Sequence, residues 1–92
     1  MNRIAVVILN WNGRAFLEKF LPSVTTLSDG ADVWVADNGS TDDSIELIRK
    51  QFPTVKVLQF DQNYGFTGGY NKALEQIDAE YFVLLNSDIE VT

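Results

Sequence analysis

Four short apolar segments alternate along the chain with three segments in which apolar residues recur every three or four positions. The apolar segments are residues 4–9, 33–36, 55–60 and 81–85. The first is a continuous β-branched run, which is typical of a strand buried on both faces of a sheet. The third alternates apolar and polar positions only in part, which favours a strand at the edge of a sheet.

The segments between these predicted strands carry helical periodicity. Residues 17–24, 45–52 and 70–77 place their apolar side chains on one face of a helix. Pro22 lies inside the first segment, where its missing backbone donor predicts a kink or a division of the helix. Ser40 and Asp43 have the spacing of a capping box, which predicts the start of the second helix, and Pro53 is expected to end it.

The alternation βαβαβαβ predicts an α/β protein with a doubly wound, mostly parallel, Rossmann-like sheet. The most buried strand is the first and the most edge-like is the third, so the predicted strand order is 3-2-1-4. Such a sheet reverses its winding between the first and fourth strands. Ligands of doubly wound proteins bind in the crevice outside the carboxyl ends of those strands.

Each predicted strand runs into polar residues, which a parallel sheet would bring to one edge. They are Asn10 and Asn12, then Asp37 and Asn38, then Asp61, Gln62 and Asn63, and finally Asn86 and Asp88. Because Asn and Asp also form turns and cap helices, any single cluster is explained about equally well without a ligand. The occurrence of such a cluster after every strand favours a ligand-binding edge.

Three further features suggest which ligand this edge would take. The glycine-rich residues 61–69 precede the third helix, where backbone amides can approach an anion. Only Arg14 and Lys72 lie near this edge in sequence, so a divalent cation would have to offset a bound diphosphate. Residues 86–88, Asn-Ser-Asp, offer oxygen donors that suit Mg²⁺ or Mn²⁺, although a strand-end turn explains the same string. Trp11 could stack on a nucleobase or pack beneath a loop.

Composition limits the partners of the chain. The 92 residues include 13 Asp and Glu against 7 Lys and Arg, and the net charge of −6 disfavours nucleic acids and anionic membranes. The absence of Cys and His excludes thiolate and imidazole chemistry. The longest purely apolar run, residues 4–9, is too short to cross a bilayer, so a cytoplasmic protein, or the soluble part of a larger one, is expected.

Four segments resemble, in order and spacing, the motifs of family 2 glycosyltransferases with the GT-A fold. They are residues 7–12, 36–42, 63–71 and 84–88. The strings Asn-Trp-Asn and Gly-Phe-x-Gly-Gly are most similar to rhamnosyltransferase-like members. The resemblance implies that residues 1–92 are the N-terminal, donor-binding half of an enzyme of polysaccharide biosynthesis. Such an enzyme transfers a sugar from a nucleotide-diphosphate sugar to an acceptor hydroxyl, usually with inversion.

The resemblance also implies roles for individual residues. Trp11 would stack on the base, and Asp37 and Asn38 would read the polar edge of the base, although Asn38 stands where Asp is common. Residues 63–71 would lie beside the ribose and diphosphate, with Tyr70 where Arg is common. Asp88, the retained acid of the Asp-x-Asp motif, would bind Mg²⁺ or Mn²⁺. The predicted donor-binding residues are Leu9, Asn10, Trp11, Asp37, Asn38, Asn63, Gly65, Phe66, Gly68, Gly69, Asn71 and Asn86.

The same resemblance places the general base and the acceptor pocket beyond Thr92. The chain alone is therefore expected to be an inactive fragment, with a saccharide or lipid-linked glycan as the acceptor of the whole enzyme. Any membrane association is expected to come from the missing part. The fourth strand would be left as an open apolar edge, which predicts a homodimer.

Two other classes share the alternating topology. A receiver-like signalling module or other non-catalytic nucleotide-binding module is one alternative, but a receiver needs an acidic pair where Asn10 and Asn12 stand. A nucleotidyltransferase is the other, and it needs a basic, glycine-rich loop after the first strand. Binding of nucleoside diphosphates with Mn²⁺ would separate these classes.

Overall fold

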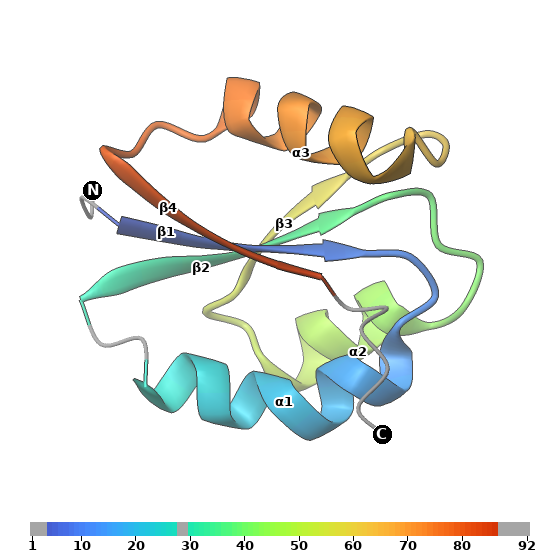
Figure 1. Ribbon diagram of the computed structural model, residues 1–92. Coiled ribbons are helices and arrows are strands. Elements are labelled where there is room, and N and C mark those ends of the chain that lie inside the picture. The colour runs from blue at the N-terminus through green and yellow to red at the C-terminus, as the bar shows by residue number, and fades with distance from the viewer. Residues whose placement is uncertain (1–3, 28–29, 87–92) are drawn as a thin grey trace.

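The computed structural model describes residues 4–27 and 30–86. In this part of the chain, strands and helices alternate as the apolar pattern predicts (Figure 1). The elements are β1 (Ile4–Asn10), α1 (Arg14–Leu27), β2 (Ala31–Asp37), α2 (Ser44–Gln51), β3 (Lys56–Gln59), α3 (Gly65–Gln76) and β4 (Tyr81–Asn86).

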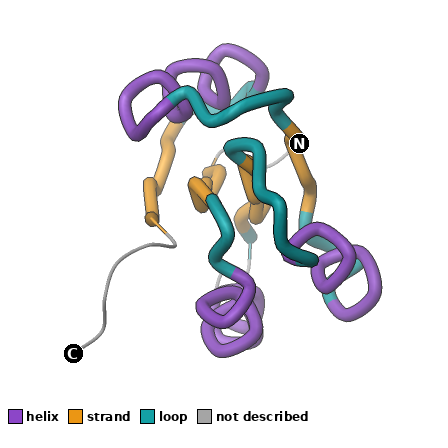
Figure 2. The backbone as a smooth tube through the Cα atoms, turned by 90° about the vertical axis from the view of Figure 1, so that its right-hand side faces the viewer, coloured by secondary structure: helices purple, strands orange, loops and turns teal. Residues whose placement is uncertain are grey.

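The four strands form one parallel sheet in the order β3-β2-β1-β4, which confirms the predicted topology. The register aligns the carboxyl ends of the strands: Asn10 lies opposite Asp37, and Leu9 lies opposite both Ala36 and Asn86. Figure 2 looks onto this edge, where the loops that follow the strands come together. The polar clusters predicted to share one edge therefore do so as far as the structure describes them.

The sheet lies between two helical layers, with α1 and α2 on one face and α3 on the other (Figure 1). Alternate residues of β1 supply both cores. Val6 and Ile8 pack with residues of α1 and α2, whereas Val7 and Leu9 pack with residues of α3. Burial of each such side chain contributes about 1.5–3 kcal/mol relative to exposure, so β1 anchors both layers.

Helix α1 continues through Pro22, so the predicted division of this helix is wrong. Pro22 and Glu18, whose carbonyl would have accepted the missing bond, both lie on the exposed side, where water can satisfy that carbonyl. Leu17 and Leu21 remain fully buried against the sheet. The packing of the buried face thus outweighs the local cost of the proline.

The starts of α2 and α3 also differ from the predictions. The capping box is wrong, because Asp43 is the N-cap of α2 without a side-chain cap bond, and Ser40 bonds to Asp37 instead. Helix α3 begins at Gly65, so much of the predicted glycine-rich loop is helical. Gly65 has a φ of 75°, a left-handed value that glycine adopts without strain.

Candidate functional site

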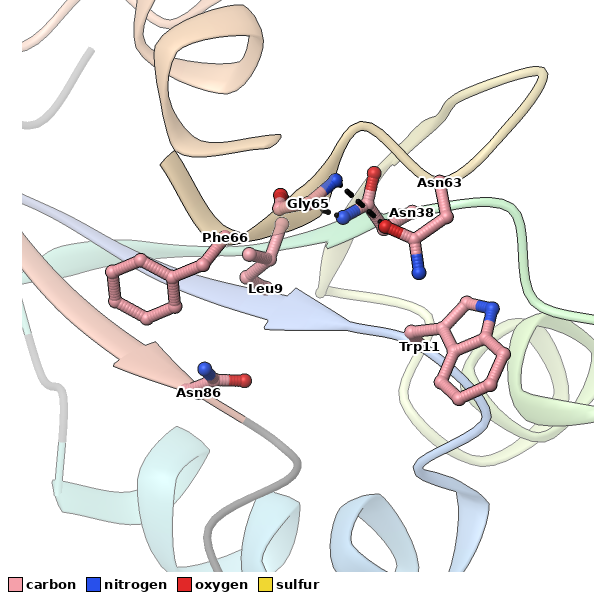
Figure 3. Close-up of a pocket in the computed structure, with 7 residues that line it drawn as sticks. All are labelled: Leu9, Trp11, Asn38, Asn63, Gly65, Phe66 and Asn86. Atoms are coloured by element: carbon pink, nitrogen blue, oxygen red, sulfur yellow. Dashed lines mark hydrogen bonds between the residues drawn. The ribbon is translucent and has the colours of Figure 1, made fainter. Parts of the chain in front are cut away.

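A pocket of about 200 Å³ lies at the carboxyl edge of the sheet, at the predicted reversal of winding between β1 and β4. Its seven lining residues come from the ends of β1, β2 and β4, from the β3–α3 connection and from the start of α3 (Figure 3). They are Leu9, Trp11, Asn38, Asn63, Gly65, Phe66 and Asn86. All of them belong to the predicted donor-binding set, so the structure brings together residues that the sequence spreads over the chain.

Two exposed aromatic rings lie on opposite sides of the pocket in Figure 3, with Leu9 between them. Trp11 is 49% exposed and Phe66 is 61% exposed, so both rings present apolar surface that a ligand in the pocket can cover. Phe66 makes an edge contact with Tyr70, with 5.0 Å between the ring centroids. Because the Trp11 ring is exposed, it presents a face on which a flat ring can stack.

Neutral amides supply the polar groups of the pocket wall. The Asn63 side-chain oxygen accepts a 2.7 Å hydrogen bond from the Gly65 amide, and this bond fixes the orientation of the side chain. In Figure 3 the Asn63 side-chain nitrogen points toward the Trp11 side of the pocket. Asn63 can therefore donate a hydrogen bond to a ligand that stacks on Trp11.

Asn10 and Asp37, two predicted site residues, are buried and do not line the pocket. Asn10 is 0% exposed and Asp37 is 1% exposed. The side-chain amide of Asn10 donates to the Asp37 carboxylate over 2.9 Å. Ser40 donates to the same carboxylate through its backbone amide and its hydroxyl. This network joins the ends of β1 and β2 and thereby stabilises the strand ends beside the pocket.

Asn12 performs a similar structural task nearer the surface. Its side-chain oxygen accepts bonds from the Thr41 and Asp42 backbone amides at 2.7 and 3.1 Å, and its backbone amide donates to the Ser40 hydroxyl over 2.8 Å. Its φ of 51° is left-handed, a conformation that Asn tolerates better than most residues. Sequence reasoning assigned Ser40 to a capping box and missed it as the shared partner of both networks, because Asn10 and Asn12 lie far from it in the sequence.

Three further predicted residues belong to α3 but do not line the pocket. Gly69 is buried against Leu9, Gly68 is half-buried, and Asn71 is exposed on α3. Asp88 lies outside the described residues. Within residues 4–27 and 30–86, no three or more His, Cys, Asp or Glu side chains form a cluster that could hold a metal ion.

Neither basic residue predicted near this edge lines the pocket. Arg14 forms ion pairs with Asp43 at 3.0 Å and with Glu18 at 3.3 Å. The Lys72 ammonium lies over the Tyr64 ring, 4.4 Å from the ring centroid. The Tyr64 hydroxyl donates a hydrogen bond to Asp61, and this bond raises the pKa of Tyr64 above its usual value. The described pocket wall therefore offers aromatic and amide contacts but no cationic side chain for a diphosphate.

A parallel sheet of this order, with a pocket at the point where its winding reverses, defines a Rossmann-like ligand-binding domain. The family described as Glycosyl transferase family 2 matches residues 5–92, and the chain belongs to this family. The predicted family is thus confirmed. Membership also favours the glycosyltransferase interpretation over the receiver-like and nucleotidyltransferase alternatives.

Curated relatives of the chain include a rhamnosyltransferase and a teichoic acid polymerase. The chain is 29% identical over 80% of its length to an N-acetylglucosaminyl-diphospho-decaprenol L-rhamnosyltransferase of Mycobacterium tuberculosis. It is 25% identical over 99% of its length to a teichoic acid poly(glycerol phosphate) polymerase of Staphylococcus epidermidis. The chain spans only 24% and 13% of the length of these two relatives.

Solved structures support the GT-A fold. TarS of S. aureus in complex with UDP-GlcNAc has a TM-score of 0.79 and 26% identity, covering 96% of this chain and 27% of TarS. A mannosyltransferase from Pyrobaculum calidifontis, in complex with GDP-Man and Mn²⁺, has a TM-score of 0.81 at 22% identity, covering 94% of this chain and 27% of the enzyme. No helix among the described residues is long and apolar enough to span a membrane.

Proposed function

We propose that these 92 residues form the donor-binding half of a glycosyltransferase that uses a nucleotide-diphosphate sugar. The observation that carries the proposal is the pocket at the reversal of winding, whose wall combines the exposed ring of Trp11 with oriented amides. TarS in complex with UDP-GlcNAc supports this ligand class, as does glucosyl-3-phosphoglycerate synthase of Mycobacterium tuberculosis in complex with Mn²⁺, UDP and phosphoglyceric acid, which is 27% identical with a TM-score of 0.77.

The nucleobase would stack on Trp11, and Asn63 would donate a hydrogen bond to an acceptor on the edge of the base. The exposed ring of Trp11 and the Asn63 side-chain nitrogen that points toward it support this role (Figure 3). Direct reading of the base by Asp37 stays a prediction. In the structure Asp37 is buried and accepts three hydrogen bonds from within the chain, which supports a role in holding the strand ends.

A divalent cation, Mg²⁺ or Mn²⁺, fits the chemistry of this edge. The described pocket wall has no cationic side chain to balance a diphosphate, and its β4 side ends in Asn86, whose amide carries an oxygen donor. We assign Asp88, two residues further along the chain, as the metal ligand. When bound, such a cation stabilises the negative charge that develops on a departing nucleoside diphosphate.

In the proposed reaction, the acceptor hydroxyl oxygen forms a bond to the anomeric carbon from the side opposite the diphosphate. The bond from the anomeric carbon to the diphosphate oxygen breaks, and its electron pair leaves with the nucleoside diphosphate. The hydroxyl proton passes to a carboxylate that acts as general base, and the configuration inverts. We place this base and the acceptor site outside residues 1–92, with a saccharide or lipid-linked glycan as acceptor.

Titration calorimetry tests the proposal. UDP, TDP and GDP are titrated into the chain with Mg²⁺, with Mn²⁺ and with a chelator, for the wild type, Asp88→Ala and the control Asp78→Ala. Asp78 is an exposed acid that follows α3, near the amino end of β4 and away from the pocket. We expect the chelator to weaken nucleotide binding by the wild type and by the control Asp78→Ala. In Asp88→Ala, binding should be equal with metal and with the chelator. If none of the nucleotides binds under any condition, the proposed function is wrong.

A further inference from the structure

The side chain of Asn38 is directed toward the protein, whereas a side chain that mainly recognises a ligand directs its polar atoms into the pocket. Asn38 follows the last residue of β2 and is 3% exposed, although it contributes to the pocket wall. Its polar atoms face the start of α3, which forms the opposite part of that wall (Figure 3). The contacts of this amide within the chain therefore decide what it can do.

Both polar atoms of the Asn38 amide bond to the backbone at the start of α3. The side-chain nitrogen donates to the Gly65 carbonyl over 3.0 Å, and the side-chain oxygen accepts from the Tyr64 amide over 2.8 Å. A backbone carbonyl can only accept and a backbone amide can only donate, so these partners fix the orientation of the side chain. An aspartate at this position could accept from Tyr64 but, when ionised, could not donate to Gly65.

Close packing keeps the amide in this place. A Cβ atom added at Gly69 would lie 2.9 Å from the Asn38 side-chain nitrogen and 2.7 Å from a methyl carbon of Leu9. A Cβ atom added at Gly39, whose φ is 80°, would lie 2.8 Å from the backbone carbon of Gln62. Two glycines therefore let the end of β2 and the β3–α3 connection approach each other so closely that Asn38 can bridge them.

We propose that Asn38 is a positioning residue, which clamps the Tyr64–Gly65 backbone to the end of β2 and thereby sets the pocket wall that carries Asn63 and Phe66. Asn63 is oriented by the Gly65 amide, so a shift of Gly65 moves the group that faces the ligand. Asn38 acts through this backbone and does not select the base. This inference rests on the proposed function only where it concerns nucleotide affinity.

The first test needs no ligand. Amide hydrogen exchange at Tyr64 is compared in the wild type, Asn38→Asp and Asn38→Ala, with the amide of Ile8 in the central strand as the internal reference. We expect exchange at Tyr64 to be about 10-fold faster in Asn38→Ala, which lacks the acceptor, and nearly unchanged in Asn38→Asp, which keeps it. The exchange rate at Ile8 should change only as far as each substitution changes the free energy of global unfolding. Equal protection of Tyr64 in all three proteins would overturn the inference.

The second test uses nucleoside diphosphates with different bases. A clamp predicts that Asn38→Asp lowers the affinity for UDP, GDP, ADP and CDP by one common factor of about 10. A residue that reads the base predicts a changed order, with affinity gained for bases that present an imide N–H and lost for the others. Such a reordering would overturn the inference while leaving the proposed function intact. Failure of the wild type to bind any of them would instead refute the proposed function, and hydrogen exchange would still decide the role of Asn38. Asn38→Asp nearly preserves the side-chain volume, so it carries the comparison if Asn38→Ala does not fold.

Discussion

Replacement of Trp11 by alanine should weaken nucleotide binding while leaving the fold intact. Trp11 is 49% exposed and belongs to neither core cluster, so its replacement should lower the free energy of unfolding by no more than about 1 kcal/mol. Stacking of an aromatic side chain on a base contributes about 1–3 kcal/mol. Because about 1.4 kcal/mol corresponds to a tenfold change in Kd, we expect the Kd to rise about 5- to 150-fold.

Tryptophan fluorescence provides the assay, since the chain has two tryptophans and the second is well separated from the pocket. Trp34 lies in the middle of β2, opposite Val7, with the Lys56 ammonium 5.2 Å from its ring centroid. In the variant Trp34→Phe, Trp11 is the single emitter, and a base stacked on its ring should quench it. Trp34→Phe should lower the unfolding temperature modestly and leave the Kd unchanged, which makes it the matched control.

Two results would refute the stacking argument. One is a Trp11→Ala protein with the wild-type Kd and the wild-type unfolding temperature, which would make the exposed ring irrelevant to the ligand. The other is a Trp34→Phe protein that binds nucleotide by calorimetry without a change in Trp11 emission. Either result would leave the pocket without a platform for the base.

Three further predictions follow from the packing and the edges of the sheet. Gly69→Ala should destabilise the chain by about 1–3 kcal/mol and weaken nucleotide binding, because the new methyl group would lie 2.7 Å from Leu9; thermal unfolding with wild-type stability would contradict this. The chain should form dimers in light scattering through the outer edge of β4, where Val83 and Leu84 are 46% and 45% exposed, and a monomer at high concentration would contradict this. The 92-residue chain should release nucleoside diphosphate from a donor no faster than slow hydrolysis, whatever acceptor sugar is added, and robust transfer would show that the donor-half proposal is wrong.

The topology could be predicted because its signals are local. The β-branched run from Ile4 to Leu9 has few alternatives to a buried strand, and the partial alternation at residues 55–60 is typical of an edge. The strand order then follows from placing the most buried strand inside the sheet and the most edge-like strand at its border. The start of α2 could not be predicted in the same way, because Ser40 bonds to Asp37 and to Asn10 and Asn12 at the end of β1 rather than to the first turn of the helix.

The candidate site could be predicted at the level of position but not of role. Parallel strands bring their carboxyl ends together, so Leu9, Asn38 and Asn86 meet although they are far apart in sequence. Asn10 and Asn63 both follow a strand and look alike in the sequence. In the structure Asn10 is consumed by a buried bond to Asp37, whereas Asn63 faces the pocket. That difference depends on tertiary packing, which the sequence pattern does not contain.

The central claim is that the pocket between Trp11 and Phe66 binds the nucleotide part of a sugar donor. A titration of UDP and Mg²⁺ into the isotope-labelled chain, followed by amide and side-chain nitrogen–proton spectra, tests it most directly. We expect the largest shifts at the Trp11 indole, the Asn63 side-chain amide and the Gly65 backbone, with little change at Ala31 and Tyr81 on the opposite edge of the sheet. Shifts confined to that opposite edge, or no shifts with any of UDP, TDP and GDP, would contradict the account.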